Sequence, residues 1–153
     1  MRKIRDHESR HHGAEEVTVL ETVQAGQTPQ FRTTVVSGFP DGRSVETSIA
    51  ATKESRQAGL TRIASLPQTA GMLFIFARTG HHRLWMPPDM LIPLDMIWLS
   101  DTGVVVELAA DVPPCQHPPC DVYGGNTQSR FALELAAGAI ARKKIALGML
   151  LEF

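Results

Sequence analysis

The chain has 153 residues, which is enough for one domain with a hydrophobic core, and a domain of this size needs neither a disulfide nor a metal in order to fold. Its 15 Lys and Arg residues nearly balance its 16 Asp and Glu residues, for a formal net charge of −1, so it lacks the field that would gather phosphate backbones or anionic lipids. We therefore expect no nucleic-acid partner, and no membrane span either, because the longest apolar runs are far shorter than the roughly 20 residues of a membrane helix.

Residues 1–16 are rich in charge and in histidine and contain Ile4 as their only large apolar group. Such a segment buries too little to become ordered by itself, so we expect a mobile tail or an arm that contacts a protein partner. Its basic start resembles a signal peptide, but no apolar stretch follows. The chain as given is expected in the cytoplasm, or in the periplasm or outside the cell if a leader has been removed.

From Val17 onward, short β-type segments alternate with turn residues, which is typical of an all-β sandwich or barrel. Hairpin turns are predicted at 38–42 and 101–103, where Pro, Asp and Gly favour tight turns. One helix is predicted to begin after the N-cap Thr52 and to end at Gly59, and a second is predicted over 139–144. We expect one mainly β domain over 17–153, with strands at 17–23, 31–36, 44–51, 72–76, 83–86, 95–99, 104–108, 131–135 and 149–153.

A series of motifs follows the third predicted strand. In chain order they include Gly71-Met72-Leu73-Phe74-Ile75-Phe76, Trp85-Met86, Leu91-Ile92-Pro93-Leu94-Asp95-Met96, Pro113-Pro114-Cys115, Pro119-Cys120 and Leu133-Glu134-Leu135. In this order and spacing they resemble the uncharacterised family called domain of unknown function 192, over about residues 45–153. The resemblance implies a compact β-sandwich of the jelly-roll type with short helical insertions. It implies no activity. Many members of the family carry a signal peptide.

The sequence departs from the pattern of that family at three places. After Trp-Met the family usually continues with Lys, Asn and Thr, whereas this chain has the longer segment 87–90 (PPDM), so a polar site shared near this turn is expected to be altered or absent. Thr61 stands where Met is usual. Lys144 stands where Gly usually precedes Ile, and a left-handed backbone at this residue would cost about 1 kcal/mol.

Cys115 and Cys120 enclose His117 in a proline-rich loop. The interpretation favoured for the family is a small disulfide loop, as in exported proteins, whereas free thiols are expected in a reducing cytosol. An alternative is a zinc or copper site formed by Cys115, His117 and Cys120, with His81 or His82 as fourth ligand. The spacing matches no standard zinc motif, so no cofactor is expected.

The turn from Trp85 to Asp95 is the candidate ligand surface. Trp85, like Trp98 and Phe74, is first expected to pack in the core. The alternative is that a tryptophan beside two prolines lies at a rim, where its ring stacks on a sugar or holds a peptide. The residues predicted to bind a ligand are Trp85, Asp89, Asp95, Arg62 and His82. Asp89 and Asp95 form an alternative catalytic pair, although Asp95 is also suited to accept backbone N–H groups in this turn. Glu54, Arg56 and Glu134 are interpreted as members of solvated faces or of a surface ion pair.

The leading hypothesis is a non-catalytic binding or accessory domain for a small molecule, a glycan or a protein, within a larger protein or a carbohydrate-associated assembly. The alternative is a small hydrolase or metal-dependent enzyme that uses Asp89 and Asp95 with His81, His82 or His117. A third hypothesis is a structural subunit whose tail, residues 1–16, becomes ordered against a partner. No glycine-rich phosphate loop or serine-hydrolase motif is present in the sequence.

Overall fold

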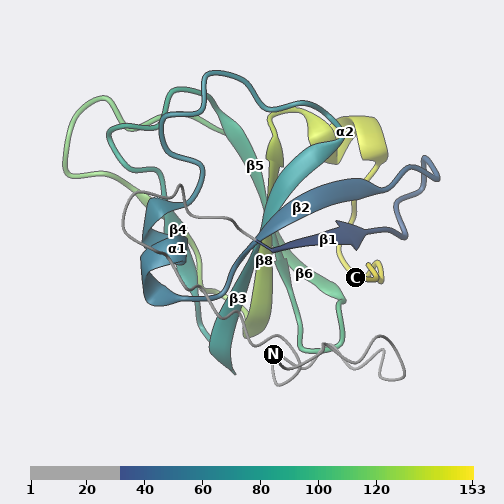
Figure 1. Ribbon diagram of the computed structural model, residues 1–153. Coiled ribbons are helices and arrows are strands. Elements are labelled where there is room, and N and C mark those ends of the chain that lie inside the picture. Colours follow the sequence, from purple (N-terminus) through teal and green to yellow (C-terminus); the bar gives the residue numbers. More distant parts are fainter. Residues whose placement is uncertain (1–31) are drawn as a thin grey trace, which may run out of the picture.

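The structure is a computed structural model that describes residues 32–153, so the predicted tail over 1–16 and the predicted strand over 17–23 lie outside the described residues. The described part contains eight strands and two short helices (Figure 1). The expected mainly β fold class is therefore confirmed. No helix in this part of the chain is long and apolar enough to cross a bilayer.

Six strands form one sheet in the order β1-β2-β3-β8-β5-β6. They are β1 (Thr33–Val36), β2 (Val45–Ala50), β3 (Ala70–Gly80), β5 (Leu94–Leu99), β6 (Val105–Val112) and β8 (Ser129–Ala136). A separate antiparallel pair consists of β4 (Arg83–Trp85) and β7 (Val122–Gly124). The described strands form no closed barrel, and their two sheets are consistent with the sandwich-like form of the two forms expected.

The strands β2 and β3 are the parallel pair in this sheet, whereas its other neighbouring strands are antiparallel. The connection between them contains α1 (Lys53–Ala58) and a long loop, and a crossover of this length lets two adjacent strands run in the same direction. Both predicted ends of α1 are confirmed. The Thr52 hydroxyl accepts the Ser55 N–H at 3.0 Å, and Gly59 ends the helix with a φ of 49°.

The second helix, α2 (Ala139–Lys143), ends at Lys144, whose φ of 53° is left-handed. The backbone conformation suggested by the glycine of the family pattern is thus adopted by a lysine. Lys143 is buried, and its ammonium lies 3.1 Å from the Asp41 carboxylate in the β1–β2 turn. This ion pair ties α2 to the first hairpin, one of the two hairpins that the turn residues predicted.

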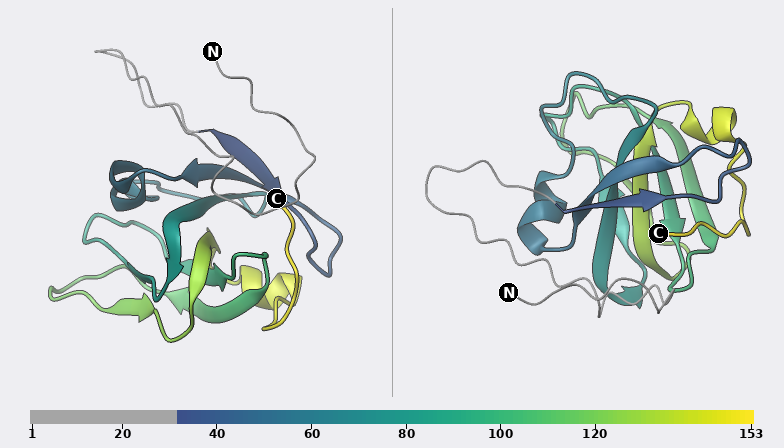
Figure 2. Two further views of the ribbon diagram at one scale, coloured as in Figure 1. Left: turned by 90° about the horizontal axis from the view of Figure 1, so that it is seen from below. Right: turned by 45° about the vertical axis from the view of Figure 1, so that its right-hand side comes forward.

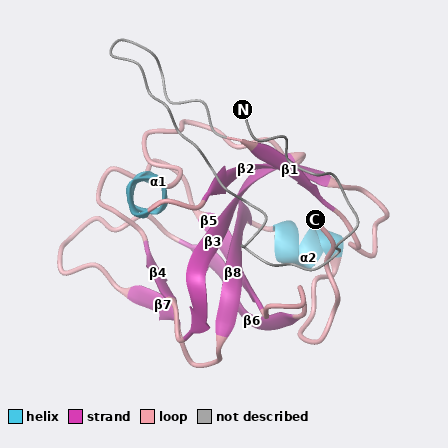
Figure 3. Ribbon diagram, turned by 60° about the horizontal axis from the view of Figure 1, so that its bottom comes forward, coloured by secondary structure: helices cyan, strands magenta, loops and turns pink. Residues whose placement is uncertain are grey.

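The large sheet is covered on both faces. Side chains alternate along β5, so that Ile97 and Leu99 pack with α2 on one face, while Met96 and Trp98 pack on the other. Figure 3 shows α2 on one side of the sheet, and α1, β4 and β7 on the opposite side. We call these two sides the α2 face and the α1 face. Every side chain of β5 is consequently buried.

The predicted strand at 149–153 is a bridging segment rather than a regular strand. Leu150 pairs with Val104 at the start of β6, and Glu152 pairs with Ser37 at the end of β1. The segment therefore connects the two edge strands of the sheet, and its end lies beside β1 (Figure 2). Leu151, between these two bridges, is fully buried.

Candidate functional site

A cavity of about 210 Å³ opens on the α1 face, between α1, β3, β4 and the turn that follows β4. Its buried lining consists mainly of apolar side chains and includes one carboxyl group, whereas its exposed lining carries cations and an indole. The buried lining residues are Leu60, Phe74, Phe76, Leu84, Met86, Met90 and Glu134. The exposed lining residues are Lys53, Gln57, Ala58, Arg83 and Trp85. We call this space the Glu134 cavity.

Glu134 lies on β8, directly opposite Met72 of β3 and Met96 of β5. Its side chain is 4% exposed, and burial raises the pKa of its carboxyl from 4.5 to about 8. Burial is the cause of this shift, and no hydrogen bond or charge of another described residue contributes to it. The carboxyl is therefore protonated at neutral pH and is available to bond a group that enters the cavity.

The expectation that Glu134 and Arg56 belong to solvated faces is wrong. The Arg56 guanidinium donates from Nη1 to the Ala51 carbonyl at 2.7 Å and to the Ile75 carbonyl at 2.9 Å, which ties α1 to β3. Glu134 is buried because β8 is a central strand with both of its faces covered. A charged residue inside the apolar run 131–136 was the available signal, since a central strand has no solvent-exposed face to receive it.

Trp85 lies at a rim, so the expectation of core packing is wrong for this residue and the alternative position is the one that it adopts. Its side chain is 49% exposed at the mouth of the Glu134 cavity, and the next three lining positions along the chain are Met86, Pro87 and Met90. The segment 87–90, in which this chain departs from the family pattern, thus forms part of the cavity wall. A change of residue type here alters the wall that faces Glu134.

Arg62 and Asp89 form a surface ion pair outside the lining of this cavity. The Arg62 Nε lies 3.6 Å from the Asp89 Oδ2, and these side chains are 84% and 48% exposed. The Arg62 N–H also donates to the Asp89 carbonyl at 3.2 Å. Arg62 therefore reaches a carboxylate of the predicted turn, but an exposed pair of this kind contributes little stability.

Asp95 is fully buried on β5, on the α2 face. Its Oδ1 accepts the Asp111 N–H at 2.8 Å, and its Oδ2 accepts the Ile140 N–H at 2.7 Å. Both oxygens are thus occupied in holding β6 and α2 against β5. Asp89, in contrast, lies in the exposed turn whose neighbour Met90 packs on the α1 face, so the two carboxylates do not meet in one pocket.

The two adjacent histidines are held by backbone carbonyls. The His82 ring stacks on Phe76 with 3.9 Å between centroids, and its Nε2 lies 2.6 Å from the Arg78 carbonyl. The His81 Nδ1 lies 2.9 Å from the Gly125 carbonyl. His82 therefore supports a lining residue of the Glu134 cavity without lining the cavity itself.

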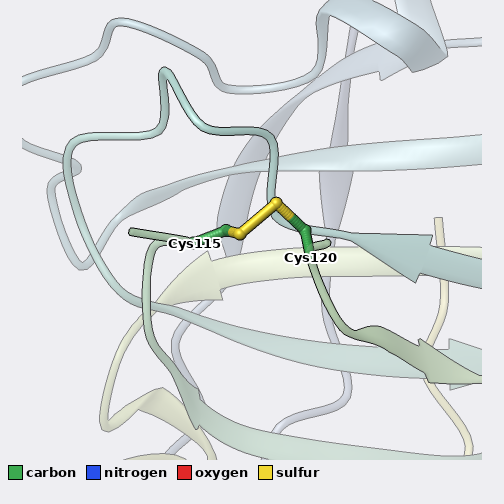
Figure 4. The surroundings of a disulfide bond; sticks show 2 residues. All are labelled: Cys115 and Cys120. Carbon is green, nitrogen blue, oxygen red and sulfur yellow. A yellow bond between two sulfur atoms is a disulfide. The ribbon is translucent and has the colours of Figure 1, made fainter. Parts of the chain in front are cut away.

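Cys115 and Cys120 form a disulfide, with 5.5 Å between their Cα atoms (Figure 4). Because both sulfur atoms are used in this bond, they do not form the alternative metal site with His117. Within residues 32–153, no group of three or more His, Cys, Asp or Glu side chains is arranged to hold a metal ion. The disulfide loop lines a shallow surface pocket that also includes Met86, so it adjoins the wall of the Glu134 cavity.

Comparisons with known proteins agree on the fold. The family model DUF192, described as "Uncharacterized ACR", matches residues 36–153. A proposed transcription regulator from Sinorhizobium meliloti 1021 has a TM-score of 0.74 and 24% identity, over 83% of this chain and 97% of that chain. A protein of unknown function from Novosphingobium aromaticivorans DSM 12444 has a TM-score of 0.71 and 23% identity, over 89% of this chain and 94% of that chain. At these identities the two structures bear on the fold alone, and no curated protein matches the chain.

Proposed function

The chain belongs to the uncharacterised family DUF192, and we propose that its domain binds a small organic ligand in the Glu134 cavity. The observation that supports this proposal is a buried carboxyl, to which no described residue contributes a hydrogen bond or charge that shifts its pKa, inside a cavity that opens to solvent. Burying a polar group without a hydrogen bond costs stability, so such a group persists mainly where it has a task. Binding a polar group of a ligand is a task that this position suits.

The size and lining of the cavity fit a ligand of one ring. A cavity of about 150 Å³ holds benzene, and this cavity measures about 210 Å³. Phe74 and Phe76 supply buried aromatic surface, and Trp85 supplies an exposed indole at the mouth. Apolar walls with few polar groups are the usual construction of small-molecule sites.

Binding is favoured over catalysis because the cavity lining contains a single acidic residue, Glu134, among the residues that the structure describes. Acid–base catalysis commonly separates two roles between two titratable groups. In the pair considered for that purpose, Asp89 lies in an exposed turn, whereas the buried Asp95 bonds backbone N–H groups of β6 and α2. We therefore propose a binding domain whose site shares Trp85 with the predicted surface.

The test is a screen of single-ring fragments, including monosaccharides. Binding is monitored by the amide and indole NMR signals of the labelled protein. Fragments that bind should shift the signals of Trp85, Leu60 and Glu134. Ala58→Trp places an indole at the mouth and should abolish these shifts, whereas Ala64→Trp, at an exposed position outside the lining, should leave them unchanged. The absence of shifts around the cavity, or equal binding by Ala58→Trp, would refute the proposal.

A further inference from the structure

We infer that the ligand of the Glu134 cavity is a ring-sized organic anion. Its negative charge lies at the mouth beside Lys53 and Arg83, and its ring carries a hydrogen-bond acceptor that meets the carboxyl of Glu134. This inference rests on the proposed function, because it names the ligand class of the same site.

The charges around the mouth favour an anion. Lys53 of α1 and Arg83 of β4 are exposed in the lining. Arg56 of α1 adds a third cation to the lining, although its guanidinium bonds backbone carbonyls. Glu134 is the one acidic side chain in the described lining. A site with this excess of positive charge attracts anions and disfavours cations, because complementary charge guides encounter and selects the partner.

The interior of the cavity favours a hydrogen-bond acceptor. Glu134 lies opposite Met72 of β3 and Met96 of β5, and neither of these side chains carries a charge. Burial is the cause that raises the pKa of Glu134 to about 8. The cations that line the same cavity from α1 and β4 are Lys53, Arg56 and Arg83, and none of them contributes to the pKa shift of Glu134. The carboxyl therefore holds its proton at neutral pH and donates an O–H to an entering oxygen or nitrogen. A buried carboxylic acid kept neutral for this purpose is known in enzyme sites.

The two ends of the cavity thus differ in what they bind, and the ring lies between them. Phe74 and Phe76 are buried in the lining, whereas Trp85 is half-exposed at the mouth. A flat ring placed between these aromatic groups would keep its charged substituent in contact with solvent and with the cations. The ligand then avoids the cost of burying its own charge.

The test is isothermal titration with three probes that share one ring. 4-Methoxybenzoate has the negative charge and the acceptor, 4-ethylbenzoate has the charge without the acceptor, and 4-methoxybenzylamine has the acceptor with a positive charge. We expect 4-methoxybenzoate to bind best. The loss of one hydrogen bond should weaken 4-ethylbenzoate by about three- to tenfold, and repulsion should weaken the amine further.

Variants separate the two ends of the site. Lys53→Gln and Arg83→Gln should each weaken 4-methoxybenzoate by about two- to fivefold, as expected for exposed charge pairs. Arg78→Gln, an exposed cation on β3 outside the lining, should have no effect. Binding to the wild type should weaken by about tenfold between pH 7 and pH 9, as Glu134 loses its proton. Glu134→Gln should bind without this pH dependence, because its amide still donates.

Two results would overturn the inference and leave the proposed function standing. The first is tighter binding of 4-methoxybenzylamine that strengthens between pH 6 and pH 8. The second is equal binding of the methoxy and ethyl acids, with no effect of Glu134→Gln on the pH dependence. Failure of all three probes to bind, together with failure of the fragment screen, would overturn the inference and the proposed function together.

Discussion

The carboxyl of Glu134 links the stability of the domain to pH. Its pKa is raised from 4.5 to about 8 by burial, so the folded protein keeps a proton that the unfolded chain releases above about pH 4.5. The stability that this group contributes is fully present below pH 4.5. It falls as the pH rises and reaches its lower limit above about pH 8.

Replacing Glu134 by glutamine removes this dependence, because an amide does not titrate. Compared with the wild type, Glu134→Gln should have nearly the same stability near pH 4.5, about 3 kcal/mol more at pH 7 and about 5 kcal/mol more at pH 8.5. Urea unfolding of both proteins at the three pH values measures this difference. A difference that does not change with pH would mean that the Glu134 carboxyl is solvated.

Asp95 should be required for folding and have no part in binding. In Asp95→Asn, one of the two acceptor oxygens becomes an NH₂ group facing a backbone N–H, so we expect a loss of about 3 kcal/mol in the free energy of unfolding. Asp89→Asn, at an exposed ion pair, should change stability by less than about 1 kcal/mol. Urea unfolding checks both values. Fragment binding that is lost in Asp95→Asn while the protein remains folded would contradict this assignment.

Lys144 adopts a left-handed conformation that glycine adopts without strain. Lys144→Gly should therefore stabilise the protein by about 1 kcal/mol. Arg142→Gly, two residues earlier inside α2, should do the opposite by about the same amount, since glycine is unfavourable within a helix. Thermal unfolding of the two variants gives the comparison. Destabilisation by Lys144→Gly would show that contacts of the lysine side chain outweigh the backbone strain.

Among the elements, α1 is the one whose stability matters most to the Glu134 cavity. It has six residues, and a helix of this length is not stable in isolation. Its capping box at Thr52 and the two bonds from Arg56 to backbone carbonyls hold it in place. Since Lys53 and Ala58 belong to this helix, local opening of α1 would also open the cavity mouth.

Removal of the N-cap tests this dependence. Thr52→Ala should cost about 1 kcal/mol and should speed hydrogen exchange at the Arg56 and Gly59 amides, whose N–H groups bond within this helix. The amides of the central strand β8 should exchange as in the wild type. Hydrogen exchange followed by NMR measures both sets. Equal protection of α1 in the two proteins would show that packing alone holds the helix.

On the scale of the whole molecule, the segment 149–153 closes the sheet at both edges. Exposed edge strands invite pairing with other chains, and this segment covers the end of β1 and the start of β6 with backbone bonds. Leu151 anchors it with a fully buried side chain. The segment therefore protects two strands that are distant in the sequence.

Truncation of that anchor should loosen both edges together. Leu151→Ala should lower the free energy of unfolding by about 3 kcal/mol, as for other buried leucines. It should also speed exchange at the amides of Ser37 and Val105, which donate to carbonyls of the segment. Leu150→Ala, at a half-exposed position, provides the control and should have a small effect. Faster exchange at one edge alone would show that the two bridges form independently.

Much of this architecture could be predicted from local signals. Alternating apolar residues located the strands of the large sheet, and Thr52 and Gly59 located α1, because capping and turn residues act over a few positions. The short strand β7 was missed, since it carries no apolar run and ends at Gly124. A side chain at that glycine would collide with Trp98.

The candidate site was harder to predict because it depends on which face of the sheet each residue occupies. The two prolines beside Trp85 suggested a rim position, but the apolar alternation over 83–86 favoured the core, and Trp85 is exposed. Asp89 and Asp95 are close in sequence, yet Asp89 lies in an exposed turn and Asp95 lies buried on β5, which begins at Leu94. The burial of Glu134 can be predicted only if its strand is known to be central. Strand order depends on contacts between distant segments, which local sequence signals do not give.

The pairing of Glu152 with Ser37 also determines how this domain must fold. The two residues lie near opposite ends of the described chain, so their contact closes a very long loop, and the parallel pairing of β2 with β3 adds a second nonlocal step. Closing such loops costs chain entropy before any contact offsets it. A topology with contacts this distant in sequence belongs with the slow folders, on the scale of milliseconds to seconds.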